Sequence, residues 1–83
     1  MNRRLGVIGI LVQDRRHAAE KINDILSAYG DLIVGRLGVP YRERNLAVIA
    51  LIVDGTTDEI GAMTGKLGSI KSVQVKSALI SRD

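Results

Sequence analysis

The sequence predicts an α+β domain of order βαββαβ, in which a four-stranded antiparallel sheet carries two helices on one face. The main observation is an internal repeat, because residues 5–12 (LGVIGILV) match residues 46–53 (LAVIALIV) at an offset of 41 positions. Each of these apolar runs precedes a segment with helical periodicity and then a further apolar run. The 83 residues, with a mass of 9.0 kDa, therefore form two βαβ units, 5–39 and 46–80, of one small domain over residues 1–83.

Each unit begins with a strand that we expect in the centre of the sheet. The runs 5–12 and 46–53 are short, rich in Val and Ile, and bounded by polar or turn residues. The side chains are apolar at both alternating sets of positions, which is typical of a central strand rather than an edge strand.

A helix is predicted after the first strand. Asp14 is in position to cap its N-terminus, and Gly30 stands where a left-handed residue commonly ends a helix. Between them, apolar residues recur at spacings of four, three, one and three: Ala18, Ile22, Ile25, Leu26 and Tyr29. This spacing places them in one stripe of a helix, which we expect to face the core.

The second helix has a stronger start signal. Thr56 followed by Glu59 is the pattern of a capping box, in which each residue satisfies a backbone N–H group of the other. Its apolar stripe consists of Ile60, Met63 and Leu67, and Gly68 ends it. Gly61 and Gly65 each cost roughly 1 kcal/mol relative to Ala inside a helix, so they predict a place where the helix backbone approaches something closely.

Each unit closes with a strand, and the two predicted strands are Leu32–Val39 and Ser72–Ile80. Residues Pro40–Asn45 bridge the units. The last strand alternates in part, with Val73, Val75 and Leu79 set against Gln74, Lys76 and Ala78. This alternation indicates a half-exposed edge strand. Two right-handed crossovers place both helices on the same face, so the predicted fold is the ferredoxin-like, split-βαβ sandwich.

The composition predicts assembly. Hydrophobic residues make up 46% of the chain but aromatic residues only 2%, and the mean hydropathy is +0.14. Two helices cover one face of the predicted sheet, yet the central strands are apolar on both faces. A contiguous exposed apolar patch on a small protein marks a partner or ligand surface. We therefore expect a homo-oligomer, a dimer or a tetramer.

Several classes of protein and site are disfavoured. The absence of Cys excludes a disulfide framework and a thiolate metal site, which fits a cytoplasmic protein. No apolar run approaches the ~18 residues of a membrane span. An RNA-recognition domain requires aromatic residues on its central strands to stack on bases, and the central strands of this chain have none. The net charge of +3 is carried by Arg residues of the first half and is small for nucleic-acid binding, so direct DNA binding is not expected.

No catalytic, metal or cofactor site is expected from the remaining motifs. His17 is the only histidine and is interpreted as a surface residue of the first helix. The acidic group Asp54, Asp58 and Glu59 lacks the spacing of a calcium loop and is better explained by helix capping. Residues 65–68 (GKLG) fail the phosphate-loop pattern and lie at the end of a helix rather than at its start.

The segment with the densest set of charged and aromatic side chains is Tyr41-Arg42-Glu43-Arg44. It could bind an anionic ligand or a neighbouring subunit, or it could be a solvated loop whose charges oppose aggregation. Arg36 interrupts an otherwise apolar strand. It is interpreted either as a charge that keeps an edge strand from pairing with other chains, or as a group that is ion-paired in an interface.

Taken in order, several short motifs resemble a known family. They are Val12-Gln13-Asp14-Arg15, Arg36-Leu37-Gly38, Pro40 with Arg42-Glu43, Ile60-Gly61-Ala62, Gly65-Lys66-Leu67-Gly68 and Val75-Lys76-Ser77. Over nearly its whole length the chain resembles the regulators of the iron-only hydrogenase system, whose fold is ACT-like and akin to the C-terminal domain of the nickel-responsive repressor. The resemblance implies a regulatory role near hydrogenase genes and oligomers that bind small effectors at subunit interfaces.

The chain departs from its relatives in ways that limit what the resemblance implies. With one His and no Cys, it lacks the ligands of the nickel-responsive proteins. No residues remain for a ribbon-helix-helix domain, so transcription regulation would act through a partner. Asp14 matches the Asp that follows the first strand of ACT domains, but residues 15–18 hold no Gly, which argues against an amino-acid effector.

The sequence thus predicts a non-enzymatic, homo-oligomeric, ACT-like module that binds a small effector or a protein partner. The candidate ligand or interface residues are Asp14, Arg36, Tyr41, Arg42, Glu43 and Arg44. Two alternatives stay open. One is a dimeric α+β-barrel enzyme acting on a small substrate at the sheet face, and the other is direct nucleic-acid binding through the Arg-rich first half.

Overall fold

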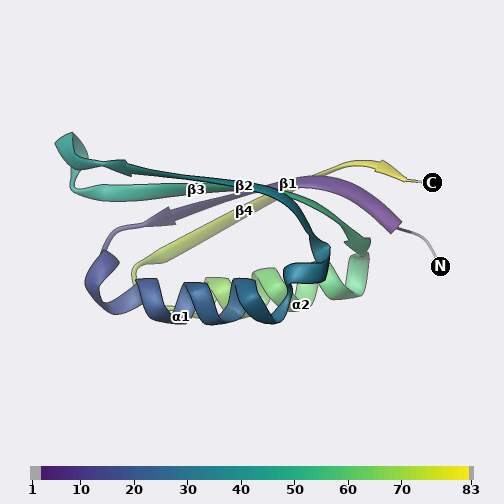
Figure 1. Ribbon diagram of the computed structural model, residues 1–83, viewed down its shortest axis with the longest axis horizontal. Coiled ribbons are helices and arrows are strands. Elements are labelled where there is room, and N and C mark those ends of the chain that lie inside the picture. Colours follow the sequence, from purple (N-terminus) through teal and green to yellow (C-terminus); the bar gives the residue numbers. More distant parts are fainter. Residues whose placement is uncertain (1–2, 83) are drawn as a thin grey trace.

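The computed structural model describes residues 3–82, and the predicted fold class is confirmed. The elements are β1 (Arg3–Val12), α1 (Arg15–Ala28), β2 (Ile33–Tyr41), β3 (Leu46–Thr56), α2 (Thr57–Gly68) and β4 (Val73–Arg82), with short 3-10 turns at Gly30–Leu32 (η1) and Arg42–Arg44 (η2). The strands form one antiparallel sheet in the order β2-β3-β1-β4. Both helices lie on one face of this sheet (Figure 1).

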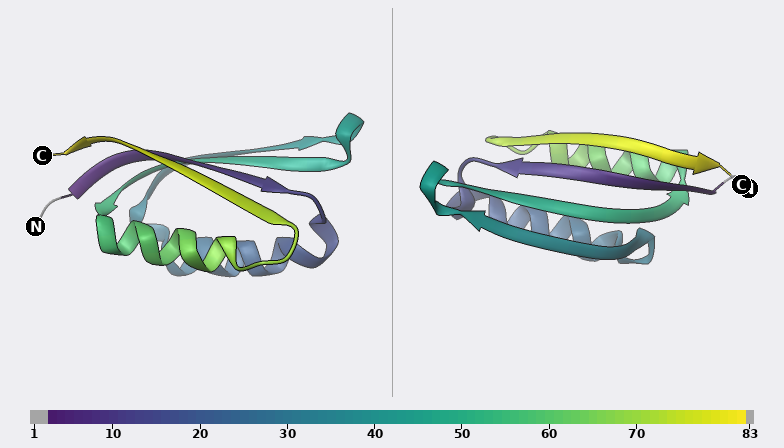
Figure 2. Two further views of the ribbon diagram at one scale, coloured as in Figure 1. Left: turned by 180° about the vertical axis from the view of Figure 1, so that it is seen from behind. Right: turned by 90° about the horizontal axis from the view of Figure 1, so that it is seen from above.

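The repeated runs form the two central strands. β1 pairs with β3 along its whole length, with Ile8 opposite Leu51 and Ile10 opposite Ile49. β2 and β4 are the edge strands, as the view onto the sheet shows (Figure 2). The offset of 41 positions maps the helix-facing residues of β1 onto the helix-facing residues of β3, for example Ile10 onto Leu51. Matching residues of the two units therefore lie on the same face of the sheet.

The core lies between the sheet and the helices. Its fully buried large side chains come from both layers: Ile8, Ile10, Leu51 and Val53 from the sheet, and Ile22, Leu26, Met63 and Leu67 from the helices. The predicted helix stripes are therefore confirmed, because their members are buried or pack against this core: Ala18, Ile22, Ile25, Leu26 and Tyr29 of α1, and Ile60, Met63 and Leu67 of α2. No polar or charged residue is buried in this core within the described part of the chain.

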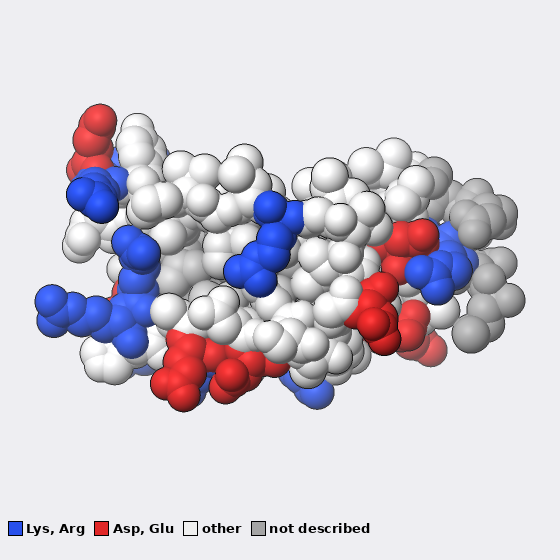
Figure 3. Space-filling view, viewed as in Figure 1, with Lys and Arg blue, Asp and Glu red and all other residues white. Residues whose placement is uncertain are grey.

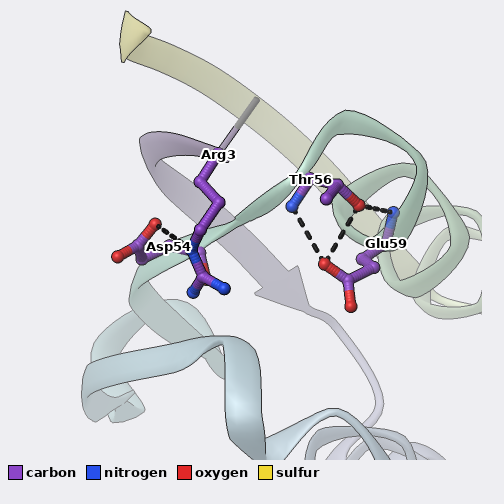
Figure 4. Close-up of polar contacts among 4 residues, drawn as sticks. All are labelled: Arg3, Asp54, Thr56 and Glu59. Atoms are coloured by element: carbon purple, nitrogen blue, oxygen red, sulfur yellow. Dashed lines mark hydrogen bonds and ion pairs between the residues drawn. The ribbon is translucent and has the colours of Figure 1, made fainter. Parts of the chain in front are cut away.

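The capping box of α2 is also confirmed. The Glu59 backbone N–H donates to Thr56 Oγ1 at 3.1 Å, and the Thr56 backbone N–H donates to Glu59 Oε1 at 3.0 Å (Figure 4). The Thr56 hydroxyl also donates to Glu59 Oε1 at 3.0 Å. The two hydrogen bonds that this carboxylate accepts, from the Thr56 backbone and side chain, favour its ionised form and hold the pKa of Glu59 below its ordinary value. Beside the cap, Arg3 Nε lies 3.2 Å from Asp54 Oδ1, so the Asp54 carboxylate also has a partner within the chain.

Three details of the helices differ from the prediction. Asp14 occupies the N-cap position of α1, but its side chain makes no capping hydrogen bond. Gly30 is not left-handed, because α1 ends at Ala28 with Tyr29 as its C-cap, and Gly30 begins η1. No close approach is found at Gly61 or Gly65 among residues 3–82, since a Cβ atom at either position would meet nothing within 4 Å.

The β2–β3 hairpin is longer than predicted. β2 continues through Pro40 to Tyr41, which an edge strand permits because the missing N–H of proline is needed only on a paired side. The turn is η2 followed by Asn45, whose φ of 55° is left-handed. The tip of this hairpin extends past the start of α1 (Figure 1).

No helix within residues 3–82 is long and apolar enough to cross a membrane.

Candidate functional site

The sheet face that points away from the helices is aliphatic and uncovered, as predicted. Strand pairing places Val7 opposite Ile52 on this face, with exposed fractions of 40% and 51%. The exposed large side chains that share the face are Leu5, Val7, Leu37, Val39, Tyr41, Val48 and Ile52. We call this surface the outer face.

Small and polar residues complete the outer face. Gly9 lies opposite Ala50 at its centre, where little side chain separates the backbone from solvent. Polar groups lie toward the margins, with the Arg3–Asp54 ion pair at one end and Lys76 on edge strand β4. In the side view, the upper margin of the molecule, where the sheet lies, is white between charged groups at the two ends, and one basic group stands below it at mid-length (Figure 3). An apolar centre with a polar rim is the usual anatomy of a protein interface.

The charged segment 41–44 is divided between the sheet and the tip of the β2–β3 hairpin. Tyr41 pairs with Leu46 and belongs to the outer face. Arg42, Glu43 and Arg44 form η2 at the tip of the hairpin, where all three are exposed. Within residues 3–82, none of these three charged side chains forms an ion pair. The structure therefore separates the aromatic residue from the charges that follow it.

Arg36 lies on the opposite side of the sheet from Tyr41. It pairs with Leu51 and so has the orientation of the helix-facing residues, at the open edge of β2. There it lines a cavity of about 240 Å³ between α1 and the β2–β3 hairpin, together with Arg15 and Asn23 of α1. Basic side chains gather at this end of the molecule (Figure 3).

Asp14 lies beside that cavity, in an adjoining hollow that shares Arg15 with it. Its carboxylate Oδ2 is 2.7 Å from His17 Nδ1, and this hydrogen bond is the main reason that the pKa of Asp14 is lowered. The backbone N–H groups of Arg16 and His17 contribute to the lowered pKa without reaching hydrogen-bond geometry. The exposed His17 is thus a surface residue, as expected.

The predicted site residues therefore occupy three places. Arg36 lines the cavity and Asp14 lies in the hollow that adjoins it, Tyr41 joins the outer face, and Arg42–Arg44 form the hairpin tip. Arg15 and Asn23 were not among the site residues predicted from the sequence. A signal for them exists, because Arg15, Ala19 and Asn23 follow each other at steps of four residues and so share one side of the helix.

Between residues 3 and 82, no three side chains of His, Asp or Glu are arranged to hold a metal ion.

Fold and site together define a small ferredoxin-like domain with an uncovered aliphatic sheet face and an Arg-lined cavity at one end. Residues 4–77 match the TM1266-like family, described as "Iron-only hydrogenase system regulator, putative", and the chain belongs to this family. The uncharacterized protein TM1266 from Thermotoga maritima is 38% identical, with a TM-score of 0.91 over 95% of this chain and 99% of that one.

More distant structures share the fold alone. A protein of unknown function from Galdieria sulphuraria is 11% identical with a TM-score of 0.64, and this chain, 95% of which aligns, covers 46% of it. CPII from Thiomonas intermedia K12, a nitrogen regulatory PII-like protein, is 16% identical in its apo form with a TM-score of 0.53 over 96% of this chain and 95% of that one. Another structure of CPII is bound to ADP, AMP and bicarbonate, with 17% identity and a TM-score of 0.51 over 99% of this chain and 96% of CPII. None of the curated proteins compared with the chain matches it.

Proposed function

We propose that this protein is a non-catalytic, homo-oligomeric regulatory module of the iron-only hydrogenase system, which assembles through its outer face and binds a small effector. The observation that carries the proposal is the aliphatic outer face, whose large side chains are 39% to 65% exposed. Leaving this much contiguous apolar surface in water is unfavourable, and burial against a partner removes that cost.

The dimensions of the outer face suit a second copy of the chain. The molecule measures 40 × 20 × 16 Å, and the view from above looks onto the sheet along the 20 Å direction (Figure 2). The face therefore spans 40 Å by 16 Å, roughly 640 Å². Stable interfaces bury about 600–1,000 Å² on each partner, so one such face can supply a standard interface.

The charge of the outer face also favours a second copy. Val7, Gly9, Ala50 and Ile52 form a centre without charge, which is complementary to an identical apolar surface in a twofold dimer. A nucleic acid would instead require a basic surface, and a barrel-type enzyme would require polar groups at the centre of this face. The regulatory module is therefore the function that this geometry supports best.

The relatives support a regulatory role. The family is described as a hydrogenase system regulator, and CPII, which shares the fold, is a nitrogen regulatory protein seen with ADP, AMP and bicarbonate. By analogy of fold, we infer that the present chain responds to a small molecule rather than transforming one.

Sedimentation velocity at micromolar concentration tests the proposal. The wild-type chain is expected to sediment as a dimer or a larger oligomer of the 9.0 kDa chain. Ile52→Lys introduces a charge into the centre of the outer face and should shift the protein to monomer. Ala62→Lys adds the same charge at an exposed position of α2 and serves as the matched control. A wild-type monomer, or an oligomer that Ile52→Lys leaves intact, contradicts assembly through this face.

A further inference from the structure

The cavity between α1 and the β2–β3 hairpin has walls of two kinds. Its apolar wall includes Val12, Ile22 and Ile49, which continue the core to the surface. Its polar groups are Arg15 and Asn23 on α1 and Arg36 on β2. The cavity therefore brings an aliphatic floor and two guanidinium groups together from different elements.

Small residues create this cavity. Gly38 pairs with Ile49 on the helix-facing side of the sheet, and a Cβ atom there would meet nothing within 4 Å. Ala19 on α1 and Ala47 on β3 also line the space. The hollow thus arises where three facing positions carry little or no side chain, and a larger residue at Gly38 would enter it without displacing the backbone.

The charges lining the cavity are all of one sign. Arg15 and Arg36 are its ionisable groups, and neither forms an ion pair or a side-chain hydrogen bond with the residues the structure describes. Both side chains are exposed to solvent and line the same apolar space, so an anion bound there would meet two positive charges. Arg presents a planar fork of N–H donors that fits a carboxylate in bidentate geometry.

We propose that this cavity binds a small aliphatic carboxylate, which identifies the effector class of the proposed regulatory module and rests on that function for its biological meaning. The carboxylate lies between Arg15 and Arg36, and the hydrocarbon chain contacts Val12, Ile22 and Ile49. The Asn23 amide is placed to bind a second polar group of the ligand.

The volume of the cavity and the charge of its lining residues define the ligand class more closely. The volume of about 240 Å³ lies below the ~300–1,000 Å³ of pockets for drug-sized ligands, so the occupant is a short-chain acid. No acidic side chain lines the cavity, and an ammonium group would therefore meet two cations and no partner. The ligand class is accordingly a carboxylic acid without an amino group.

NMR titration of the ¹⁵N-labelled chain with three probes tests the proposal. The probes are 3-methylbutanoate, the neutral 3-methylbutanol with the same hydrocarbon body, and inorganic phosphate as an anion without one. We expect 3-methylbutanoate to shift the amide signals around Gly38 and Ile49 and to bind about tenfold more tightly than either other probe.

Three variants and one control locate the binding. Arg36→Gln and Arg15→Gln should each weaken 3-methylbutanoate binding about tenfold, because each removes a charge-assisted hydrogen bond. Gly38→Val should abolish binding by filling the cavity, while its amide spectrum stays folded. Lys21→Gln removes the same charge from another side of α1, outside the cavity, and should bind like the wild type.

Several results overturn the proposal. They are the absence of shifts at the cavity, equal affinity for the alcohol or for phosphate, and wild-type affinity in Gly38→Val. Affinity that falls as protein concentration rises would show that a second copy occupies the cavity, and this also contradicts the proposal. Sedimentation is measured on the same samples, so loss of the carboxylate site with an intact oligomer is distinguished from failure of the proposed assembly.

Discussion

Two isoleucines on neighbouring strands lead to opposite predictions for the same substitution. Ile8 is fully buried on the helix-facing side of β1, and Ile52 is 51% exposed on the outer face of β3. Ile8→Ala removes buried atoms and leaves a cavity, which should lower the free energy of unfolding by about 2–5 kcal/mol. Ile52→Ala should cost the folded single chain much less, because half of that side chain is already in water.

The effect of Ile52→Ala should instead fall on assembly. Fully burying an isoleucine side chain contributes about 1.5–3 kcal/mol, and assembly buries the exposed half of Ile52. This amounts to about 1 kcal/mol for each copy and about 2 kcal/mol for a twofold dimer, before the smaller contribution of alanine is subtracted. Since 1.4 kcal/mol corresponds to a factor of ten, the dimer Kd should rise about tenfold.

Sedimentation equilibrium and chemical denaturation measure the two effects separately. Denaturation at a protein concentration below the dimer Kd reports the single chain, because unfolding of an oligomer depends on concentration. The two variants lose the same atoms and so control for each other. The reasoning is refuted if Ile52→Ala leaves the Kd unchanged, or if it destabilises the single chain as much as Ile8→Ala does.

Three further predictions concern local structure. Thr56→Ala removes the cap of α2 and should lower the free energy of unfolding by about 1 kcal/mol, measured by urea denaturation, whereas an unchanged midpoint would contradict the role of the cap. The pKa of Glu59 is lowered in the folded state, so its stabilising contribution is complete above the ordinary pKa of Glu and is lost as the pH falls through the folded-state pKa. Glu59→Gln should therefore lose less stability than the wild type on acidification below about pH 5, as pH-dependent thermal melts will show, and parallel curves for the two proteins would exclude this linkage. Gly61→Ala should stabilise the protein by about 0.4–1 kcal/mol, because the position is open and lies within a helix, and a loss of stability would reveal a contact there.

The sequence predicted those parts of the fold that short-range patterns determine. The repeat located both central strands, and the capping box located the start of α2, because each signal lies within a few residues of what it specifies. The uncovered apolar face could also be predicted, since it follows from counting two helices against a sheet whose central strands are apolar on both sides.

Glycine positions were predicted less well, because the reason for a glycine depends on its neighbours in space. Gly61 and Gly65 have open surroundings. The tight positions lie elsewhere, and one is Gly55, where a Cβ atom would lie 2.8 Å from the Leu32 side chain. The other is Gly6, where a Cβ atom would lie 2.9 Å from the Leu79 side chain and 3.0 Å from the Ala78 carbonyl oxygen. This contact arises at the irregular pairing of β1 with β4, which no local pattern indicates.

Asp14 shows how a competing local contact defeats a capping rule. Asp14 occupies the N-cap position, but its carboxylate is hydrogen-bonded at 2.7 Å to ring Nδ1 of His17, three residues further on, and not to the helix backbone. The Arg-lined cavity was beyond the sequence analysis for a related reason. Arg15 and Arg36 are 21 positions apart, and only the crossover from α1 to β2 brings them to the same opening.

The central claim is that two copies meet through the outer face, and isotope-filtered NOE spectroscopy tests it most directly. In an oligomer assembled from methyl-labelled and unlabelled chains, every intermolecular NOE reports a contact between copies. The account predicts intermolecular NOEs at the methyl groups of Val7, Val48 and Ile52, which lie on the outer face. Intermolecular NOEs confined to the helix surfaces, or none at these three residues in a confirmed oligomer, would contradict it.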